Sequence, residues 1–281
     1  MSSAGRGDAR AMPNSILDRI VERKRREVAR RRGRMDLVDE ANRRSPADVS
    51  RSEQAIAALR RSGSRLPRAI AEIKTRSPSA GVIRPRLSGE IAAIARAYEE
   101  AGAAAVSVLC DGPDFGGNPL DVRRAAHAVA LPLLFKEFVI DPSQVTLARR
   151  MGAHMVLLVA RILKPNELSA LAAETSRQGL APVVEVWDEE QLETALDTGA
   201  PIIGVNARDL STFRLNPEAA ARLVGQIPEN RVKIHMSGIA SREDLLRVAD
   251  TPADAVLIGE ALMRAPYPGE RLREILEHRT D

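Results

Sequence analysis

Eight short, largely apolar runs rich in Val, Ile and Leu alternate with helix-compatible segments from residue 68 onward. A strand that is apolar along most of its length is buried on both faces, which is typical of a parallel sheet covered by helices. Eight such units predict a single (β/α)8 barrel, also called a TIM barrel, in the α/β class. The runs cover residues 68–74, 104–110, 131–136, 154–160, 182–187, 201–206, 232–237 and 254–260.

A doubly wound sheet is the competing architecture for such an alternation. Doubly wound sheets usually have fewer strands and carry a GxGxxG turn after the first strand. The first turn here reads KTRSPSAG, over residues 74–81, and lacks that pattern. The chain length of 281 residues also suits a barrel of about 250 residues with an extension. We therefore favour the barrel.

The N-terminal region has a different pattern from the barrel. In ILDRIVERKRREVARRR, residues 16–32, apolar residues recur at helical spacing among charged ones. A second helical stretch ends at Gly63. These stretches hold too few apolar residues for a core of their own. We expect a disordered tail over residues 1–13, an N-terminal helical extension over 14–66 and the barrel over 67–281.

The charge distribution raises the question of a nucleic-acid partner. Residues 1–68 hold 18 Lys and Arg against 9 Asp and Glu, whereas the rest of the chain holds 24 against 29. A basic segment can bind nucleic acid, and residues 19–34 are the candidates. Aromatic residues make up only 2% of the chain, so stacking platforms for single strands are scarce. We favour a solvated basic helix packed on an acidic body and do not expect nucleic acid as a partner.

Composition also bears on compartment and metals. No uncharged apolar run approaches the roughly 20 residues of a membrane span, and the opening MSSAGRGDAR lacks the apolar centre of a secretory signal. The single cysteine, Cys110, cannot form an internal disulfide, which fits a reducing cytosol. His127, His154 and His278 are not spaced as metal ligands. We predict a cytoplasmic protein without a membrane partner or a metal site.

Charged residues stand at or near the carboxyl ends of several runs, where barrel enzymes carry their chemistry. Only five of the 42 basic residues are Lys, so a Lys at a strand end is informative. Glu72 and Lys74 are two apart and face the same side of their strand. Lys136 ends the third run and Glu185 lies inside the fifth. Such charges are either inward ion pairs that fill the barrel or a site, and we favour the site.

Small residues follow the last two runs, in MSGIAS (236–241) and LIGEAL (257–262). Small residues after strands seven and eight let backbone N–H groups approach a phosphate. The alternative is a pair of tight turns that need glycine. The pattern indicates a phosphate-binding barrel without specifying a reaction. The candidate phosphate-binding residues are Ser237, Gly238, Gly259 and Glu260.

Longer motifs carry a resemblance to a known family. AEIKTRSPSAG, LLFKEFVIDPSQV, PVVEVWDEEQL, IIGVNARDLSTF and AVLIGEALM resemble, in order and spacing, the indole-3-glycerol phosphate synthases of tryptophan biosynthesis. ILDRIVERKRREV and SVLCDGPDFGG extend the resemblance over roughly residues 14–265. The resemblance implies a lyase that closes the indole ring of 1-(2-carboxyphenylamino)-1-deoxyribulose 5-phosphate with loss of CO2 and water. It implies no metal and no organic cofactor.

The resemblance also implies residue roles. Lys136 matches the general acid that protonates the ketone, and burial is expected to lower its pKa. Lys74 matches a residue near the substrate carboxylate that assists dehydration. Glu185 matches an acid–base carboxylate, and Glu72 one that orients the lysines and relays protons.

Further residues match the family's substrate-binding positions. Asn206 and Arg208 match residues near the anthranilate moiety, and a guanidinium suits its carboxylate. For Phe138 and Leu210, core packing explains the residue as well as ligand contact does. The candidate substrate-binding residues are Ser77, Pro78, Phe138, Asn206, Arg208 and Leu210.

One departure keeps the function open. The family pattern S-E-S-G has a carboxylate where this chain has Met236, so an anion is missing beside two cations. Three hypotheses follow: an indole-3-glycerol phosphate synthase, a paralogue for a modified anthranilate or other amino-ketose phosphate, or a weakly catalytic barrel that acts as a binding subunit. Both enzyme hypotheses imply a phosphorylated small-molecule substrate, and we expect a monomer. His235, beside Met236, is interpreted as a packing residue.

Overall fold

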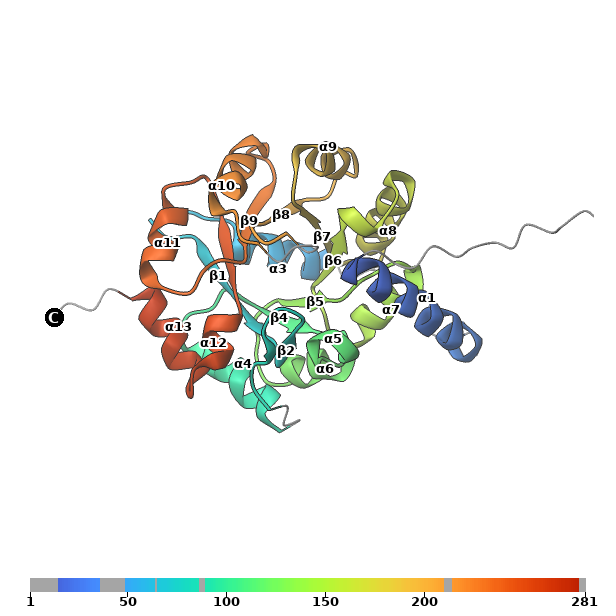
Figure 1. The fold of residues 1–281 in the computed structure, drawn as a ribbon, viewed down its shortest axis with the longest axis horizontal. Helices are drawn as coiled ribbons and strands as arrows, with labels where there is room; N and C mark the ends of the chain where they lie inside the picture. Colours follow the sequence, from blue (N-terminus) through green and yellow to red (C-terminus); the bar gives the residue numbers. More distant parts are fainter. Residues whose placement is uncertain (1–14, 36–48, 64, 86–88, 210–213, 278–281) are drawn as a thin grey trace, which may run out of the picture.

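The computed structural model describes residues 15–35, 49–63, 65–85, 89–209 and 214–277. Eight parallel strands form a closed barrel, with β1 paired to both β4 and β10 (Figure 1). The predicted (β/α)8 architecture is therefore confirmed. The barrel strands are β1 (Arg68–Ile73), β4 (Ala105–Leu109), β5 (Leu133–Lys136), β6 (Met155–Val159), β7 (Ala181–Val186), β8 (Ile202–Asn206), β9 (Val232–Met236) and β10 (Ala255–Ile258).

A ring of helices surrounds the strands (Figure 1). Local sequence explains where several of them begin, because Asn118, Asp141 and Asn216 cap a helix N-terminus and a proline follows each cap. The ring consists of α4 (Glu90–Glu100), α6 (Pro119–Ala126), α7 (Pro142–Arg150), α8 (Pro165–Arg177), α9 (Glu189–Asp197), α10 (Pro217–Gln226), α11 (Arg242–Ala249) and α13 (Pro268–Leu276).

Shorter elements interrupt the ring on the loops that follow the strands. A two-stranded hairpin follows β1, and short helices follow β4, β6 and β10. These loops leave the carboxyl ends of the strands, which is where a barrel places its site. The short elements are β2 (Arg76–Ser77), β3 (Gly81–Val82), α5 (Gly112–Phe115), η1 (Ala160–Ile162) and α12 (Glu260–Arg264).

The alternation of side chains along the strands produces two apolar cores. In β9, Val232, Ile234 and Met236 join a core inside the barrel, together with residues from other strands. The residues between them, Lys233 and His235, face the other side of the strand. A second, larger core fills the space between the strands and the helices. The inner core leaves the carboxyl end of the barrel to the charged residues described below.

The N-terminal helices lie at different places on the barrel. Helix α3 (Val49–Leu59) contacts the barrel strands, and its fully buried Ala55 and Leu59 belong to the inner core. Helix α1 (Ile16–Met35) contacts α7, and its Leu17 and Ile20 pack against Phe138, just beyond β5. The predicted tail over residues 1–13 lies outside the described residues. The boundaries of the extension and barrel stay a prediction.

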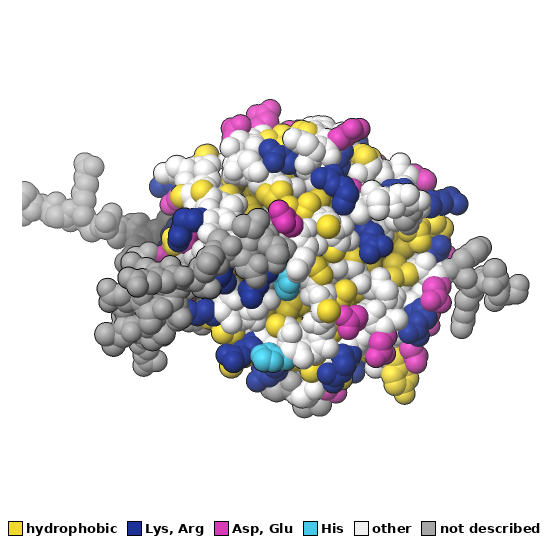
Figure 2. All heavy atoms as spheres, turned by 180° about the vertical axis from the view of Figure 1, so that it is seen from behind, with side chains coloured by type: hydrophobic (Ala, Val, Ile, Leu, Met, Phe, Trp, Pro, Cys, Tyr) yellow, Lys and Arg dark blue, Asp and Glu magenta, His cyan; other side chains and the backbone are white. Residues whose placement is uncertain are grey.

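The outer surface bears on the expected partners. Figure 2 shows the face turned away in Figure 1, where, on its described part, basic side chains are separated by acidic, apolar and uncharged areas. Nucleic-acid binding through phosphates needs clustered basic side chains. The absence of a nucleic-acid partner stays a prediction. Among the described helices, none is both long and apolar enough to cross a membrane.

Candidate functional site

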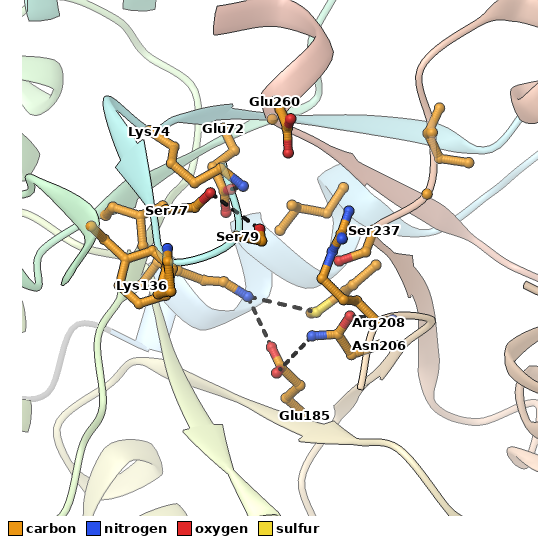
Figure 3. Close-up of a pocket in the computed structure, with 18 of the residues that line it drawn as sticks. Glu72, Lys74, Ser77, Ser79, Lys136, Glu185, Asn206, Arg208, Ser237 and Glu260 are labelled. Carbon is orange, nitrogen blue, oxygen red and sulfur yellow. Dashed lines mark hydrogen bonds and ion pairs between the residues drawn. The ribbon is translucent and has the colours of Figure 1, made fainter. Parts of the chain in front are cut away.

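A cavity of about 360 Å³ opens at the carboxyl ends of the strands. Its lining includes every predicted site residue that the structure describes, whereas Leu210 lies outside the described residues. Figure 3 shows side chains from opposite sides of the barrel converging on this space. The predicted residues that line it are Glu72, Lys74, Ser77, Pro78, Lys136, Phe138, Glu185, Asn206, Arg208, Ser237, Gly238, Gly259 and Glu260.

Lys136 stands at the end of β5, and its ammonium contacts Glu185 and Met236 (Figure 3). The Lys136 Nζ donates to Glu185 Oε2 at 2.9 Å. The other oxygen of Glu185 accepts a hydrogen bond from Asn206 Nδ2 at 3.0 Å. The Met236 sulfur lies 3.8 Å from the Lys136 Nζ. Glu185 is thus fixed between an ammonium and an amide, and it fixes Lys136 in turn.

The pKa of Lys136 differs from the expected direction. Burial lowers the pKa of this ammonium, but the negative charges of Glu185 and Glu72 outweigh burial, and the pKa is raised above its ordinary value. The expectation of a lowered pKa was wrong because burial acts here together with two nearby carboxylates. Lys136 is consequently a protonated group at neutral pH.

A second Lys–Glu pair lies at the end of β1, where Glu72 belongs to the strand and Lys74 directly follows it. The two-residue spacing of Glu72 and Lys74 puts both side chains in the cavity, with Lys74 Nζ 3.1 Å from Glu72 Oε1. Ser107 Oγ donates to the other Glu72 oxygen at 3.2 Å. Gly259 is needed beside this pair, because a Cβ on residue 259 would come within 2.6 Å of Glu72 Oε1. The cavity therefore holds two ammonium–carboxylate pairs from different strands.

The predicted phosphate-binding residues border the same cavity. Ser237 has a φ of +70° and is the only described residue other than glycine with a positive φ. A serine in the left-handed region is strained, and such strain concentrates at functional sites. Glu260 brings a negative charge to this side, and Arg264 donates to its Oε1 from Nε and Nη2 at 3.0 and 2.9 Å. Arg264 therefore offsets the charge of Glu260.

Met236 fits its place closely. Its side chain is 1% exposed, and a Cβ on residue 204 would lie only 2.2 Å from the Met236 Cε, so Gly204 makes room for it. The methionine belongs to the apolar core inside the barrel and also lines the cavity. Its neighbour His235 is buried, which lowers its pKa to about 4 and leaves it neutral. The packing interpretation of His235 agrees with this burial.

An aromatic wall closes the cavity on the side of β5. Phe138 lines the cavity, and its ring lies 5.8 Å from the ring of Phe115 on α5. Leu17 and Ile20 of α1 also pack against Phe138. Phe138 thus combines the two alternatives considered for it, because it is a packing residue and also faces the cavity.

Sequence reasoning missed several residues of this region. Ser79, Phe115, Leu215, Ile239 and Arg264 line the cavity without having been singled out. These residues lie on loops or short helices after the strands, and those segments approach the cavity only because the barrel closes. Arg264 carried one available signal, since it lies four residues after Glu260, the spacing of a helical ion pair.

A buried charge cluster on α1 was also missed. Lys24 Nζ lies within 3.1 Å of carboxylate oxygens of Glu27, Asp111 and Glu137. Its signal was its position, because Lys24 lies four residues after Ile20 and four before Val28, on the buried stripe of the helix. In an Arg-rich helix, that one lysine on an apolar stripe could have been recognised. Among the described residues, no group of His, Cys, Asp and Glu is arranged to hold a metal ion.

Comparisons with known proteins agree with the motifs. A family model described as indole-3-glycerol phosphate synthase matches residues 17–275. A curated protein named indole-3-glycerol phosphate synthase from Dechloromonas aromatica is 39% identical over 267 residues, which cover 93% of this chain and 99% of that protein. One of the same name from Koribacter versatilis is 44% identical over 207 residues, 74% of this chain and 79% of that protein.

Solved structures show a likeness of fold. A tryptophan synthase complex from Pyrococcus furiosus matches with a TM-score of 0.58 at 13% identity, over 74% of this chain and 97% of that chain. An N-acetylmannosamine-6-phosphate 2-epimerase from Clostridium perfringens matches with a TM-score of 0.56 at 17% identity, over 73% and 89%. At such low identity these matches show the fold alone.

Proposed function

The chain belongs to the indole-3-glycerol phosphate synthase family, and we propose that it closes the indole ring of 1-(2-carboxyphenylamino)-1-deoxyribulose 5-phosphate with loss of CO2 and water. This makes it a carbon–carbon lyase, a decarboxylase of tryptophan biosynthesis. The observation that carries the proposal is the Lys136 ammonium, held 2.9 Å from Glu185 in a cavity with a second Lys–Glu pair.

Ring closure requires a proton donor. When the aromatic carbon attacks the ketone of the sugar arm, a carbon–carbon bond forms and the ketone oxygen takes up the electron pair of the broken π bond. Lys136 donates a proton to that oxygen as the general acid. Its raised pKa keeps it protonated at neutral pH, so the donor is present when the substrate binds. Glu185 orients the ammonium and serves as the acid–base group that returns its proton.

Loss of CO2 and water completes the indole. The carboxylate leaves as CO2, and the electron pair of its bond restores the aromatic ring. The hydroxyl formed in the first step then leaves as water with a proton from Lys74, and one proton leaves the adjacent ring carbon, so that the electron pair of its C–H bond forms the double bond. Glu72, 3.1 Å from Lys74, orients that lysine and accepts a proton. Each of the two ammonium–carboxylate pairs thus supplies the proton for one of the two steps.

The remaining residues bind the substrate. Arg208 and Lys74 offer positive charge to the substrate carboxylate, and Asn206 borders the anthranilate ring. Phe138 supplies an aromatic wall, with Ser77 and Pro78 on the loop after β1. The phosphate lies against the backbone of Ser237, Gly238 and Gly259, where Arg264 offsets the charge of Glu260. We infer a cytoplasmic, monomeric enzyme.

A second candidate function rests on Met236. A neutral thioether 3.8 Å from the Lys136 ammonium occupies a position where a carboxylate would add charge. This neutral position favours a paralogue that takes a modified anthranilate or another amino-ketose phosphate. The substrate of that paralogue would still present a ketone and a phosphate to the same residues.

A turnover assay tests these candidates. Purified protein is mixed with the carboxyphenylamino-deoxyribulose phosphate while indole fluorescence is followed. We expect turnover in the wild type and a loss of about 10²- to 10⁴-fold in Lys136→Ala. Lys164→Ala is the matched control, because Lys164 is exposed and does not line the cavity, and it should retain wild-type turnover. A wild type that binds the substrate without turnover would contradict the synthase proposal and favour the paralogue.

A further inference from the structure

Helix α1 carries a buried lysine outside the cavity. Lys24 is 3% exposed, and its Nζ lies 2.9 Å from Glu27 Oε2, 3.1 Å from Asp111 Oδ1 and 3.1 Å from Glu137 Oε2. Asp111 is fully buried and Glu137 is 5% exposed. Buried charges persist where they are paired, and here one ammonium pairs with carboxylates from three segments of the chain. The cluster joins α1 to the ends of β4 and β5.

The cluster is attached, through Glu137, to a segment that lines the cavity. Glu137 directly follows Lys136, and its Oε1 accepts a hydrogen bond from the Phe138 backbone N–H at 2.8 Å. The carboxylate of Glu137 therefore ties Lys24 to the backbone between the proposed general acid and the aromatic wall. Lys136 and Glu137 both border the cavity, and Glu137 also reaches α1, where its Oε2 lies 3.1 Å from Lys24 Nζ. A shift of Glu137 consequently moves the backbone that carries Lys136.

A second contact attaches α1 to the neighbouring loop. Arg23 Nη2 lies 2.6 Å from Asp111 Oδ1, and Arg23 also pairs with Asp114. Asp111 caps α5 by accepting a hydrogen bond from the Asp114 N–H at 3.0 Å. Helix α5 carries Phe115, which packs on Phe138. One face of α1 thus holds the loops after β4 and β5 together.

We propose that Lys24 is a positioning residue for the reaction. Through Glu137 it holds the carboxyl end of β5 so that the Lys136 ammonium stays against Glu185. Catalysis depends steeply on such positioning, since a misplacement of about 1 Å can cost about 100-fold in rate. The kinetic part of this inference rests on the proposed function, whereas the placement of Lys136 can be measured without turnover. The competing explanation is that Lys24 only anchors α1 to the barrel.

The experiment uses two variants and a control. Lys24→Met removes the ammonium. Lys24→Met with Glu137→Gln removes one charge of each sign, and the glutamine oxygen can still accept from the Phe138 N–H, so the fold is expected to persist. Arg26→Met is the matched control, because Arg26 lies on the same helix, its side chain is 63% exposed and it forms an ion pair with Glu22 of α1. Circular dichroism and denaturant unfolding establish that each variant is folded at the assay temperature.

The first readout is kcat, measured together with the inhibition constant of inorganic phosphate. We expect both Lys24 variants to lower kcat by about 10- to 100-fold. Competitive inhibition by inorganic phosphate should stay unchanged, because Ser237, Gly238 and Gly259 line the cavity just after β9 and β10, away from β5. Arg26→Met should match the wild type in both. A folded double variant with wild-type kcat would overturn the proposal.

The second readout does not depend on activity. Only five lysines occur in the chain, so labelling by an amine reagent at several pH values, followed by mass spectrometry, reports on Lys136 by itself. We expect the labelling rate of Lys136 to change in the double variant and not in Arg26→Met. Unchanged labelling of Lys136 would overturn the proposal even in a protein without turnover. Absence of turnover in the wild type, with changed labelling in the double variant, would contradict the proposed function and support the positioning role.

Discussion

Two lysines of this protein, Lys24, which is buried, and Lys136, which is partly buried, have very different surroundings. Lys24 on α1 has carboxylate oxygens of three residues within 3.1 Å. Lys136 on β5 has one carboxylate at 2.9 Å and a thioether at 3.8 Å. Of its three N–H donors, the Lys24 ammonium uses two in hydrogen bonds to Glu27 and Glu137, and it forms a further ion pair with Asp111. The shell of Lys136 holds one strong acceptor and borders the cavity, where a substrate oxygen can complete it.

The pKa values do not separate these two lysines. For Lys24, burial lowers the pKa, but Glu137, Asp111 and Glu27 outweigh burial, and the pKa is raised. For Lys136 the same opposition between burial and carboxylates also raises the pKa. The two lysines differ instead in how fully protein acceptors surround the N–H groups of their ammonium. A lysine with an incomplete shell facing a cavity can act on a ligand, whereas a lysine with a complete shell holds segments together.

The largest expected effect tests this difference through stability. Lys24→Met leaves Asp111 and Glu137 buried without that ammonium, and breaking a buried pair in this way costs about 3–5 kcal/mol of unfolding free energy. Lys136→Met should cost about half as much or less, because Glu185 keeps its hydrogen bond from Asn206 and borders the cavity. Urea unfolding of both variants measures the two losses. Equal losses would show that the two shells are energetically alike.

The same two lysines show how much of the site could be predicted from the sequence. Lys136 was recognised because it ends an apolar run and sits in a motif, both of which are local features. The meeting of the predicted site residues in one cavity could also be predicted, because the strand ends of a barrel meet at one edge. The partners of Lys24 could not be predicted in this way. Glu137 lies 113 residues from Lys24, and Asp111 lies 88 residues from Arg23, so their meeting depends on where α1 packs.

The charge pattern was only partly informative for the same physical reason. A basic helix packed on an acidic body was expected, and α1 does contact acidic residues of the barrel. The pattern treated the helix as a solvated face, whereas Lys24 is buried on its apolar stripe. Net charge reports on long-range attraction and not on which single charge loses its water. The pKa of Lys136 was misjudged likewise, because its direction depends on carboxylates from β7 and β1.

A second prediction sharpens the comparison through pH. Glu185→Gln removes the charge that contributes most to raising the pKa of Lys136. The ammonium then loses its proton at a lower pH, so the basic limb of the kcat profile should move to lower pH. We also expect kcat to fall by about 10²-fold, typical for the loss of an acid–base group. Glu190→Gln is the matched control, because Glu190 is exposed on α9 and does not line the cavity. A basic limb that stays in place would mean that Lys136 does not control it.

The smallest effects are expected at Met236, where the shell of Lys136 is incomplete. Met236→Glu adds a carboxylate at a position whose present sulfur lies 3.8 Å from the ammonium, and should raise the pKa of Lys136. The basic limb of kcat then moves to higher pH, opposite to the Glu185→Gln shift. If the chain is the proposed paralogue, this variant also gains activity on the ordinary substrate. Absence of any gain would count against the paralogue.

Met236→Leu separates charge from shape at the same position. Leucine keeps the apolar volume between Gly204 and the ammonium, and swaps of this kind usually cost under about 1.5 kcal/mol. If the thioether only fills space, kcat and its pH profile should match the wild type within a few-fold. A large loss of kcat in Met236→Leu with unchanged unfolding free energy would instead show that the sulfur helps to hold Lys136. In that case the shell of Lys136 is as complete as that of Lys24, and the difference between the two lysines would lie in their access to the cavity alone.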